Sequence, residues 1–385
     1  MNKKIIYDYV ICGSGAAGLS LINELINDNF FLNHRILLLD KKKKITNDRT
    51  WTYWEKGEGK HDDILKKKWS KAYFSSKNLK LTFETKPYQF KCIRGINFYD
   101  KILKKISKYK NITVLNEEVE KIIDQNDIVK VITNKNTFKC KKAFSSIMKP
   151  ISDNKKYPLL KQHFIGWFIK TEKNIFNDDK ITFMDFDIDQ KNNTRFMYIL
   201  PYKKNEALIE YTLFSKNLLN DTEYETEIKN YIDEKLKVNF KIIEKENGVI
   251  PMTSFEFWKF NSKNLIYIGT AGGWTKSSTG FTFFKTIKKS KELKEYLKTN
   301  EALDKFEKKN KYWLYDSVLI DVLYENNSLG EKVFETMFKK NSPKLILDFL
   351  DEKTTFQEDI KLFLNFPKII FLKSLVKRLF KTIFL

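Results

Sequence analysis

Cysteine, histidine and long apolar runs are scarce in this chain of 385 residues. The three cysteines, Cys12, Cys92 and Cys140, are widely spaced and odd in number. This pattern argues against a disulfide framework or a CxxC site and predicts a protein of the reducing cytoplasm. The three histidines lack metal-ligand spacing, so no metal site is expected. No run approaches the ~20 apolar residues of a membrane-spanning helix, and Asp8 interrupts the short apolar N-terminus, unlike a signal peptide.

Acidic residues are too few to balance the basic ones. Lys and Arg number 71 against 49 Asp and Glu, which gives a formal net charge of +22. Such an excess is compatible with binding to nucleic acid or to an anionic membrane. The excess is mostly lysine, and no RNA-binding or helix-turn-helix signature accompanies it, so we favour a solvated basic surface and expect no nucleic-acid partner. With 42% hydrophobic residues, the chain is long enough for two packed modules.

The N-terminal segment carries a dinucleotide-binding pattern. Residues 5–12 predict a buried parallel strand, a helical pattern follows, and a second predicted strand ends in Asp40. Between strand and helix, Gly13, Gly15 and Gly18 have GxGxxG spacing. Gly13 permits the tight turn, Gly15 lets the backbone approach a pyrophosphate, and Gly18 lets helix and strand pack closely. The helix N-terminus attracts phosphate, and Asp40 is placed to bind a ribose hydroxyl.

The expected cofactor is FAD, because no second GxGxxG provides a separate nicotinamide domain. Arg94 stands just before a helical pattern, and residues 111–147 read as short strands with turn signals at 126–127 and 134–136. A helix, a β-meander and a return strand resemble the insertion in FAD-binding oxygenase-like folds. The expected fold class is therefore α/β, with a Rossmann-type FAD-binding domain, an inserted β-rich substrate domain and a helical C-terminal region.

A second glycine cluster lies in LIYIGTAGGWTKSSTGFTFF, residues 265–284. It resembles the late flavin-contacting segment of the p-hydroxybenzoate-hydroxylase-like flavoproteins. Its amino-acid sequence is most similar to that of the lycopene cyclase family, in particular the bacterial lycopene β-cyclases. Further blocks that resemble this family occur in family order, namely NDRTWTYWE (47–55), QHFIGWFI (162–169), FMDFDIDQ (183–190), FMYILPYKKNEALIEYTLFS (196–215) and GVIPMT (248–253).

The chain departs from the family pattern at three points. Thr270 stands where the hydroxylase-like folds usually carry an acid, and Ser277 replaces the proline of the KPSTG turn. Glu210 stands alone where plant relatives have a doubled acid. The last difference argues against a mechanism that needs two adjacent carboxylates.

The resemblance implies a non-covalent FAD that is active in its reduced form, with NAD(P)H as the reductant. The two glycine clusters and the resemblance together give these expected cofactor contacts: Gly13, Gly15, Ala16, Ala17, Gly18, Asp40, Arg49, Arg94, Val119, Gly269, Thr270, Gly272, Gly273, Thr279 and Gly280.

The resemblance also implies a redox-neutral cyclisation of lycopene, through γ-carotene, to β-carotene. The ψ-end is protonated at C2, and the ring cation then loses a proton to give the β-ionone ring. Because the substrate is a hydrocarbon and the intermediate a cation, the site must be an apolar tunnel that excludes water. Aromatic faces stabilise a desolvated cation by roughly 1–2 kcal/mol, although ordinary core packing is the favoured interpretation for any single aromatic residue. The expected lining residues are Trp51, Trp54, Trp167, Phe183, Phe186, Tyr198, Tyr211 and Trp274.

Glu210 is the expected acid. It stands in ALIEYTLF, residues 207–214, whose other residues suit a buried strand. Burial beside a reduced flavin would keep this carboxyl protonated, as a general acid requires. The alternative is a strand carboxylate on a wet face. Asp185, Asp187 and Asp189 alternate and would share one face of a strand, but three like charges indicate a wet face, so they rank below Glu210.

The last third of the chain is expected to be helical and to end in a basic amphipathic helix. The predicted apolar stripe consists of Ile369, Leu372, Val376, Leu379 and Ile383. The basic residues lie elsewhere on the helix, at Lys373, Lys377, Arg378 and Lys381. Such a helix suits an anionic membrane surface, and the alternative is a terminal helix packed on the core with a solvated basic face. Because lycopene resides in the bilayer, we expect peripheral attachment to the inner face of the cell membrane.

These patterns predict an FAD-binding domain of residues 1–75, 92–150 and 245–295, a substrate cap of residues 76–91 and 151–244, and a helical region of residues 296–385. The competing activity is a flavin-dependent monooxygenase or a polyprenyl reductase on the same fold. Product mass separates the two hypotheses, because cyclisation leaves the mass unchanged. The sequence leaves the oligomeric state open.

Overall fold

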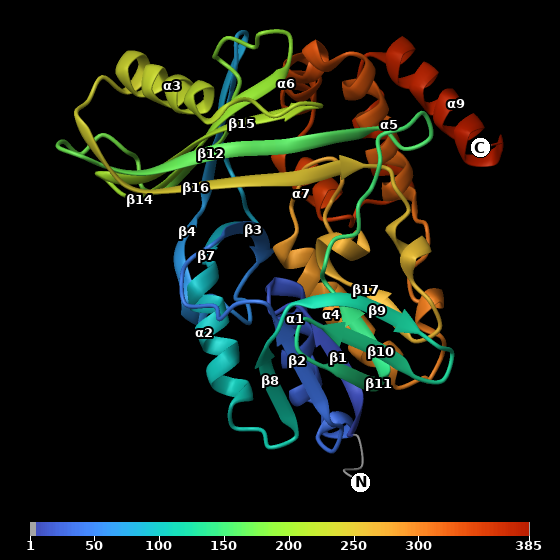
Figure 1. Cartoon of the computed structure of the whole chain (residues 1–385). Helices are drawn as coiled ribbons and strands as arrows, with labels where there is room; N and C mark the ends of the chain where they lie inside the picture. The colour runs from blue at the N-terminus through green and yellow to red at the C-terminus, as the bar shows by residue number, and fades with distance from the viewer. Residues whose placement is uncertain (1–4, 385) are drawn as a thin grey trace.

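The computed structural model describes residues 5–384, which form three sheets and a helical C-terminal region (Figure 1). The sheet that contains the N-terminal strand lies at one end of the molecule, and a large, mostly antiparallel sheet crosses the other end. A small sheet connects the two, and the C-terminal helices pack beside the large sheet. Within the described residues, no helix is both long and apolar enough to cross a membrane.

The first sheet is built on the parallel strands that the sequence predicts. β1 (Ile6–Cys12) pairs in parallel with β2 (Ile36–Asp40) and with β11 (Thr137–Ser145). The strand order is β8-β2-β1-β11-β10-β9, and the remaining strands are β8 (Ile112–Asn116), β9 (Val119–Asp124), β10 (Val129–Thr133) and β17 (Leu265–Tyr267), which pairs with β11. The apolar faces of three helices share one core with this sheet: α1 (Ala16–Ile26), α2 (Gly95–Ile106) and α4 (Phe283–Leu297).

The large sheet has the strand order β16-β12-β15-β14-β13-β5-β6. Its strands are β5 (Lys71–Ser76), β6 (Leu79–Glu84), β12 (Leu159–Thr171), β13 (Lys180–Asp185), β14 (Thr194–Lys203), β15 (Glu206–Ser215) and β16 (Phe240–Thr253). Helix α3 (Asp221–Tyr231) covers one face, where Ile209 and Leu213 pack against it. The other face, which includes Leu208 and Phe214, packs toward the C-terminal helices. Both faces of β15 are therefore buried, which explains its nearly continuous apolar sequence.

Two expected domain boundaries differ from the sheet topology. Residues 71–75 and 245–253 were expected in the FAD-binding domain, but they belong to β5 and β16 of the large sheet. A strand's sequence shows its alternation but not its partner, because strand pairing is decided by tertiary contacts.

The small sheet has the order β3-β7-β4 and consists of β3 (Thr50–Lys56), β4 (Leu65–Trp69) and β7 (Tyr88–Arg94). Its strand β3 lies against the large sheet, where the Tyr198 hydroxyl donates a hydrogen bond to Thr52 Oγ1 at 3.0 Å. The start of β3 therefore reaches the same face of the large sheet as the C-terminal helices.

The C-terminal region consists of α5 (Lys311–Glu325), α6 (Gly330–Lys340), α7 (Pro343–Leu350), α8 (Phe356–Phe363) and α9 (Lys368–Phe384). Their apolar side chains form one cluster with the large sheet, in which Phe338 stacks on Phe74 at 4.3 Å between ring centroids and Phe334 stacks on Phe186 at 5.6 Å. The helical region is thus part of the core and forms a wall over the sheet.

The apolar stripe of α9 points outward. Its exposed members, with exposed fractions, are Ile369 (72%), Leu372 (62%), Val376 (62%) and Leu379 (43%). The buried side is basic, because the Arg378 guanidinium forms an ion pair with Asp321 of α5 at 2.6 Å. The helix packs on α5, as the alternative of a terminal helix packed on the core expects, but the structure contradicts the solvated basic face of that alternative because Arg378 and Lys381 are buried. The side chain of Ile383 lies outside the described residues.

Candidate active site

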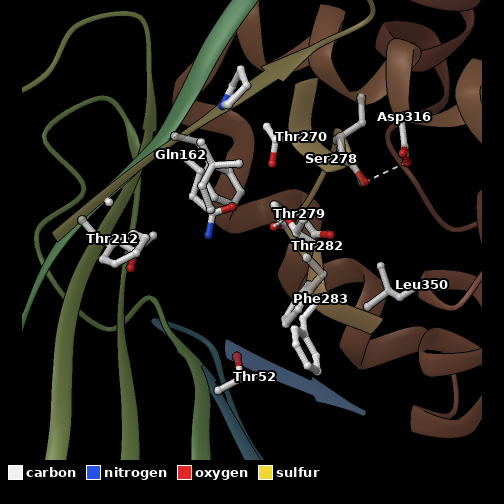
Figure 2. A pocket seen from close by; sticks show the side chains of 18 of the residues that line it. Thr52, Gln162, Thr212, Thr270, Ser278, Thr279, Thr282, Phe283, Asp316 and Leu350 are labelled. Atoms are coloured by element: carbon white, nitrogen blue, oxygen red, sulfur yellow. Dashed lines mark hydrogen bonds between the residues drawn. The ribbon is translucent and has the colours of Figure 1, made fainter. Parts of the chain in front are cut away.

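A cavity of about 980 Å³ runs from the GxGxxG loop to the C-terminal helices. Its walls come from the start of α1, the glycine-rich turn after β17, the face of the large sheet opposite α3, and helices α5 to α9. Figure 2 looks into this cavity, with Gln162 and Thr212 on the sheet side and Thr279 and Phe283 across from them. Most lining residues are apolar, so the cavity connects the GxGxxG loop, whose pattern is typical of dinucleotide binding, to an apolar compartment.

The GxGxxG loop has the conformation that its glycines predict. Gly13 has φ 104°, which L side chains rarely adopt. A Cβ at Gly18 would lie 1.9 Å from the Gly13 carbonyl oxygen, so Gly18 allows close packing of helix and strand. A Cβ at Gly15 would meet nothing within 4 Å, and Gly15, Ala16 and Ala17 line the cavity. No side chain caps the α1 N-terminus, which leaves its backbone amides available to a ligand.

The other predicted cofactor contacts near this loop are Asp40, Arg49, Val119 and Arg94, and of these only Arg49 lines the cavity. Asp40 ends β2 and accepts hydrogen bonds from the backbone N–H and the hydroxyl of Ser14, at 2.7 and 2.8 Å. Val119 begins β9 and packs in the core of the first sheet, away from the cavity walls. Arg94 is engaged elsewhere, because its guanidinium pairs with Glu244 at 2.6 Å.

The late glycine-rich turn approaches α1 closely. Gly269 has φ 63°, and a Cβ there would lie 2.7 Å from the Cβ of Ala17. The two glycine motifs, far apart in the sequence, therefore meet at one end of the cavity. The predicted contacts that line the cavity are Gly269, Thr270, Thr279 and Gly280, whereas Gly272 and Gly273 pack behind the turn against Tyr267 and Phe257.

Three buried oxygen atoms of the cavity wall have no hydrogen-bond partner among the described residues. They are Gln162 Oε1, Thr279 Oγ1 and Thr286 Oγ1, and Figure 2 shows the side chains of Gln162 and Thr279 at the cavity. A buried polar atom without a partner costs about 1–3 kcal/mol. This part of the cavity therefore suits a ligand that carries polar groups.

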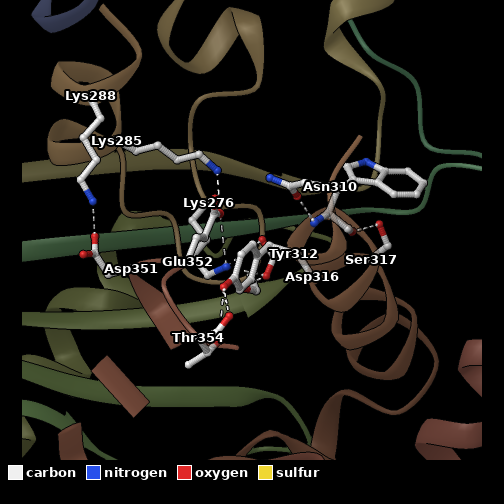
Figure 3. A network of polar contacts seen from close by, with 12 residues as sticks. Lys276, Lys285, Lys288, Asn310, Tyr312, Asp316, Ser317, Asp351, Glu352 and Thr354 are labelled. Atoms are coloured by element: carbon white, nitrogen blue, oxygen red, sulfur yellow. Dashed lines mark hydrogen bonds and ion pairs between the residues drawn. The ribbon is translucent and has the colours of Figure 1, made fainter. Parts of the chain in front are cut away.

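Lys276 ties the late turn to the C-terminal helices (Figure 3). Its buried ammonium pairs with Asp316 of α5 at 2.9 Å and lies 3.6 Å from Glu352, which follows α7. Burial alone would lower the pKa of Lys276, but the two carboxylates raise it, so the ion pair stays charged. Ser278 donates to the same Asp316 at 2.7 Å. These contacts fix the turn that presents Thr279 to the cavity.

Three of the predicted aromatic lining residues do line the cavity: Trp51, Phe183 and Tyr198. Trp51 also stacks on Phe283 with ring centroids 4.9 Å apart. The wall that the C-terminal helices contribute was not predicted from the sequence. It includes Tyr315, Leu319, Phe363 and Phe371.

The other five predicted lining residues lie elsewhere. Trp167 and Tyr211 pack on the α3 side of the large sheet, because successive residues of a strand face opposite sides. Phe186 packs in the core between Phe196 and Phe334. The last two are Trp54, which borders a separate cavity of about 280 Å³, and Trp274, whose indole donates to Glu307 at 2.8 Å in the core of the first sheet.

Glu210 lies in the cavity wall on β15 and is buried. Burial raises the pKa of Glu210 well above its ordinary value, and the charge of Glu246 raises it further. The three aspartates do not share one face, because β13 ends at Asp185 and the two others follow the strand. Asp185 accepts a hydrogen bond from Tyr231 of α3 at 2.7 Å, and Asp187 pairs with Lys235 at 2.8 Å.

A second carboxyl, that of Glu246, lies beside Glu210, and sequence reasoning missed it. In the central strand β12, Gly166 is paired with Glu210 of β15 on one side and with Glu246 of β16 on the other. The charge and the hydrogen-bonding capacity of Glu246 both raise the pKa of Glu210. Thr50 Oγ1 of β3 donates to Glu246 Oε2 at 2.7 Å. No local sequence signal could have paired these residues, because three different strands bring them together.

Comparisons with known proteins agree with this geometry. Solved structures that share the fold include a geranylgeranyl bacteriochlorophyll reductase-like protein (Ta0516) from Thermoplasma acidophilum, 13% identical over 96% of this chain and 99% of that chain, with a TM-score of 0.61. They also include p-nitrophenol 4-monooxygenase PnpA from Pseudomonas putida DLL-E4, 12% identical over 97% of each chain, with a TM-score of 0.55. A variant of the halogenase PltM in complex with FAD is 11% identical over 98% of this chain and 92% of that chain, with a TM-score of 0.59.

At these identities the structural matches establish the fold, which is the p-hydroxybenzoate-hydroxylase-like flavoprotein fold with a Rossmann-type domain. A search of curated proteins returned no match. Residues 8–376 match the family described as lycopene cyclase protein. Because that match spans nearly the whole described chain, the protein belongs to the lycopene cyclase family.

Proposed function

We propose that this protein is a lycopene β-cyclase, which converts the ψ-ends of lycopene, through γ-carotene, to the β-ionone rings of β-carotene. The observation that carries the proposal is a buried carboxyl, Glu210, in the wall of a largely apolar cavity that continues to the dinucleotide-type loop. A hydrocarbon offers no polar handle, so its site needs shape, an acid and little else. The family membership supports the same reaction class.

The residues at the two glycine motifs fit FAD. Open space at Gly15 beside the uncapped start of α1 suits a pyrophosphate. The unpartnered oxygens of Gln162 and Thr279 suit the polar groups of a flavin ring. Reduced FAD would supply negative charge near the cationic intermediate, which is a large electrostatic effect where water is excluded. We propose NAD(P)H as the reductant that prepares this form.

In the proposed reaction, Glu210 protonates C2 of the terminal alkene and leaves the positive charge at C1. The C5–C6 alkene then forms a bond from C6 to C1, and the charge moves to C5. Loss of the C6 proton forms the ring alkene, and the Glu210 carboxylate can take that proton back. The substrate gains one proton at C2 and loses one from C6, so its formula is unchanged and it is neither oxidised nor reduced. The faces of Trp51 and Tyr198 border the cavity and can stabilise the cations.

We further propose that lycopene enters from a membrane surface at α8 and α9. Ile360, Leu364 and Leu372 line the cavity and are also 44%, 60% and 62% exposed, so the cavity opens onto an apolar patch. Lys368 lines the same opening, and Lys377 is exposed on α9. Apolar residues flanked by lysines suit an anionic lipid surface. Peripheral attachment to the inner face of the cell membrane follows from this proposal.

Expression in a lycopene-accumulating bacterium, followed by pigment chromatography, tests the proposal. The parent protein should produce γ-carotene and β-carotene, whose mass equals that of lycopene. Glu210→Gln should retain FAD and lose conversion by roughly 10²–10⁴-fold, because the amide cannot donate the proton. Parent-level conversion by this folded variant would show that Glu210 is only a strand residue.

The second candidate is a flavin-dependent monooxygenase or polyprenyl reductase. It is supported by the structural neighbours, which include a monooxygenase and a geranylgeranyl bacteriochlorophyll reductase-like protein. In an anaerobic assay with lycopene, the cyclase should need reduced FAD but consume no NAD(P)H per turnover. A product whose mass differs from lycopene, with stoichiometric NAD(P)H consumption, would support the second candidate instead.

A further inference from the structure

Glu246 has no role in the reaction as proposed so far, yet its position relative to the acid is closely defined. Strand β12 separates β15 from β16, and at Gly166 it presents no side chain between Glu210 and Glu246. A Cβ at Gly166 would lie 2.7 Å from Glu210 Cγ, so the space over this glycine is already filled by the Glu210 side chain. The glycine thus lets two carboxyls from strands on either side of β12 meet.

A hydrogen bond between two carboxyl groups requires one proton on the pair, because two carboxylates have only acceptors. Glu210 is the more deeply buried partner and lines the apolar cavity. Glu246 is half-buried and accepts a second hydrogen bond, from Thr50. That bond stabilises the carboxylate form of Glu246 and leaves the proton on Glu210.

The surrounding groups shift the pKa of Glu246 in both directions. Burial raises the pKa of Glu246 overall and the Glu244 carboxylate raises it further, whereas Thr50 and Arg94, itself paired with Glu244, lower it. Among the described residues, no such lowering contribution acts on Glu210, whose pKa is raised by burial and by Glu246. The remaining titratable groups that face the pair are neutral phenols and a thiol. They are Tyr198, Tyr202 and Cys92, and burial raises the pKa of each. The carboxylate partner of Glu210 is therefore Glu246.

We propose that Glu246 is a positioning residue that holds the acidic proton on Glu210, so that the acid of this enzyme is a carboxylic acid–carboxylate pair assembled across Gly166. The proposal rests on the proposed cyclase function. Glu246 provides, from the separate strand β16, the second carboxyl that the sequence around Glu210 lacks. The proposal also explains why the pKa of Glu210 is raised and how its side chain is held against the cavity.

Two measurements on Glu246→Gln test the proposal, with Glu225→Gln as the matched control. Glu225 pairs with Lys245, the neighbour of Glu246, so the control removes one nearby carboxylate without touching Glu210. Infrared titration comes first, in which the carbonyl stretch of protonated Glu210 is identified as the band that Glu210→Gln lacks. In Glu246→Gln this band should disappear at lower pH than in the parent, because the neighbouring negative charge is gone. The control should titrate like the parent.

The second measurement is the dependence of lycopene conversion on pH. Glu246→Gln should lose roughly 10-fold or more near neutral pH and recover at acidic pH, whereas a purely structural defect would lower the rate equally at every pH. If Glu246→Gln does not retain FAD, Glu246→Ser replaces it in both measurements. An unshifted Glu210 band in a folded variant would overturn the proposal. A parent protein that leaves lycopene unchanged would overturn the proposed function instead, and the infrared result would still decide whether the pair exists.

Discussion

Gly166→Ala should displace Glu210, the proposed catalytic acid, without disturbing the GxGxxG loop. The added Cβ would stand 2.7 Å from Glu210 Cγ and 2.9 Å from Leu208 Cδ1. Carbon atoms in contact prefer about 3.5–4.0 Å, so both side chains would have to move by roughly 1 Å. Gly166 lies within a regular strand and is not among the positive-φ glycines, so the backbone itself tolerates alanine.

The two effects of this substitution differ in size and can be measured separately. A misplacement of about 1 Å at a reacting group can cost roughly 10²-fold in rate, which corresponds to about 2.7 kcal/mol of transition-state stabilisation. Overpacking of the sheet should lower the free energy of unfolding by about 1–3 kcal/mol. Conversion of lycopene by the FAD-reduced protein measures the first effect, and denaturant unfolding measures the second.

Gly57→Ala is the matched control for lost stability. Gly57 has φ 69° and open space around it, so alanine there strains the backbone by about 1–2 kcal/mol without contacting the site. This control should unfold more easily and still convert lycopene at the parent rate per folded molecule. The reasoning fails if Gly166→Ala, once folded, stays within about twofold of the parent rate, because the position of Glu210 would then not limit catalysis.

Two further predictions concern the cofactor and the membrane. Gly15→Val should fold, because a Cβ at Gly15 meets no protein atom within 4 Å. The valine side chain would occupy the space assigned to the pyrophosphate, so the flavin absorbance of the purified protein should be lost. A folded variant with parent-level flavin would refute that assignment. Leu372→Glu combined with Val376→Glu should release the protein from anionic liposomes while FAD is retained, because the two exposed side chains belong to the proposed membrane patch. Ile243→Glu, at a 64% exposed residue of β16, is the control and should stay bound. Equal liposome binding by the parent, the double variant and this control would exclude the patch as the membrane-binding surface.

Truncation of the tail is a poor test of membrane binding in this protein. Arg378 forms a buried ion pair with Asp321 of α5. Removing α9 would take away both cationic partners of Asp321, Arg378 and Lys381, and would uncover the face of α5 that α9 covers. A truncated protein could therefore misfold for reasons unrelated to lipid, whereas substitutions on the exposed stripe leave the ion pair intact.

The sequence determined the features that depend on neighbouring residues. Gly13, Gly15 and Gly18 act through local backbone geometry, so their spacing was enough to predict the loop and the helix start. The turns of the β-meander were predicted for the same reason, and Asn126 at one of them has φ 70°. The apolar run around Glu210 indicated a buried strand with one carboxyl, and the structure has that strand as β15.

Tertiary structure decided which face each strand residue would occupy. Trp167 and Tyr211 were expected at the cavity, yet they pack under α3, because a shift of one residue along a strand reverses the direction of the side chain. The C-terminal helices likewise formed a cavity wall that no motif indicated. Helical periodicity identifies an apolar face but does not identify the element that the face will cover.

The pairing of the two carboxyls is the clearest case of a feature that only the folded chain decides. Glu210, Glu246 and Thr50 come from three strands of two sheets, and they meet because Gly166 leaves room between them. Their protonation depends on burial and on one another's charge, which exist only once the strands have paired. The sequence therefore specified a carboxyl on a buried strand, and the sheet register determined which second carboxyl lies beside it.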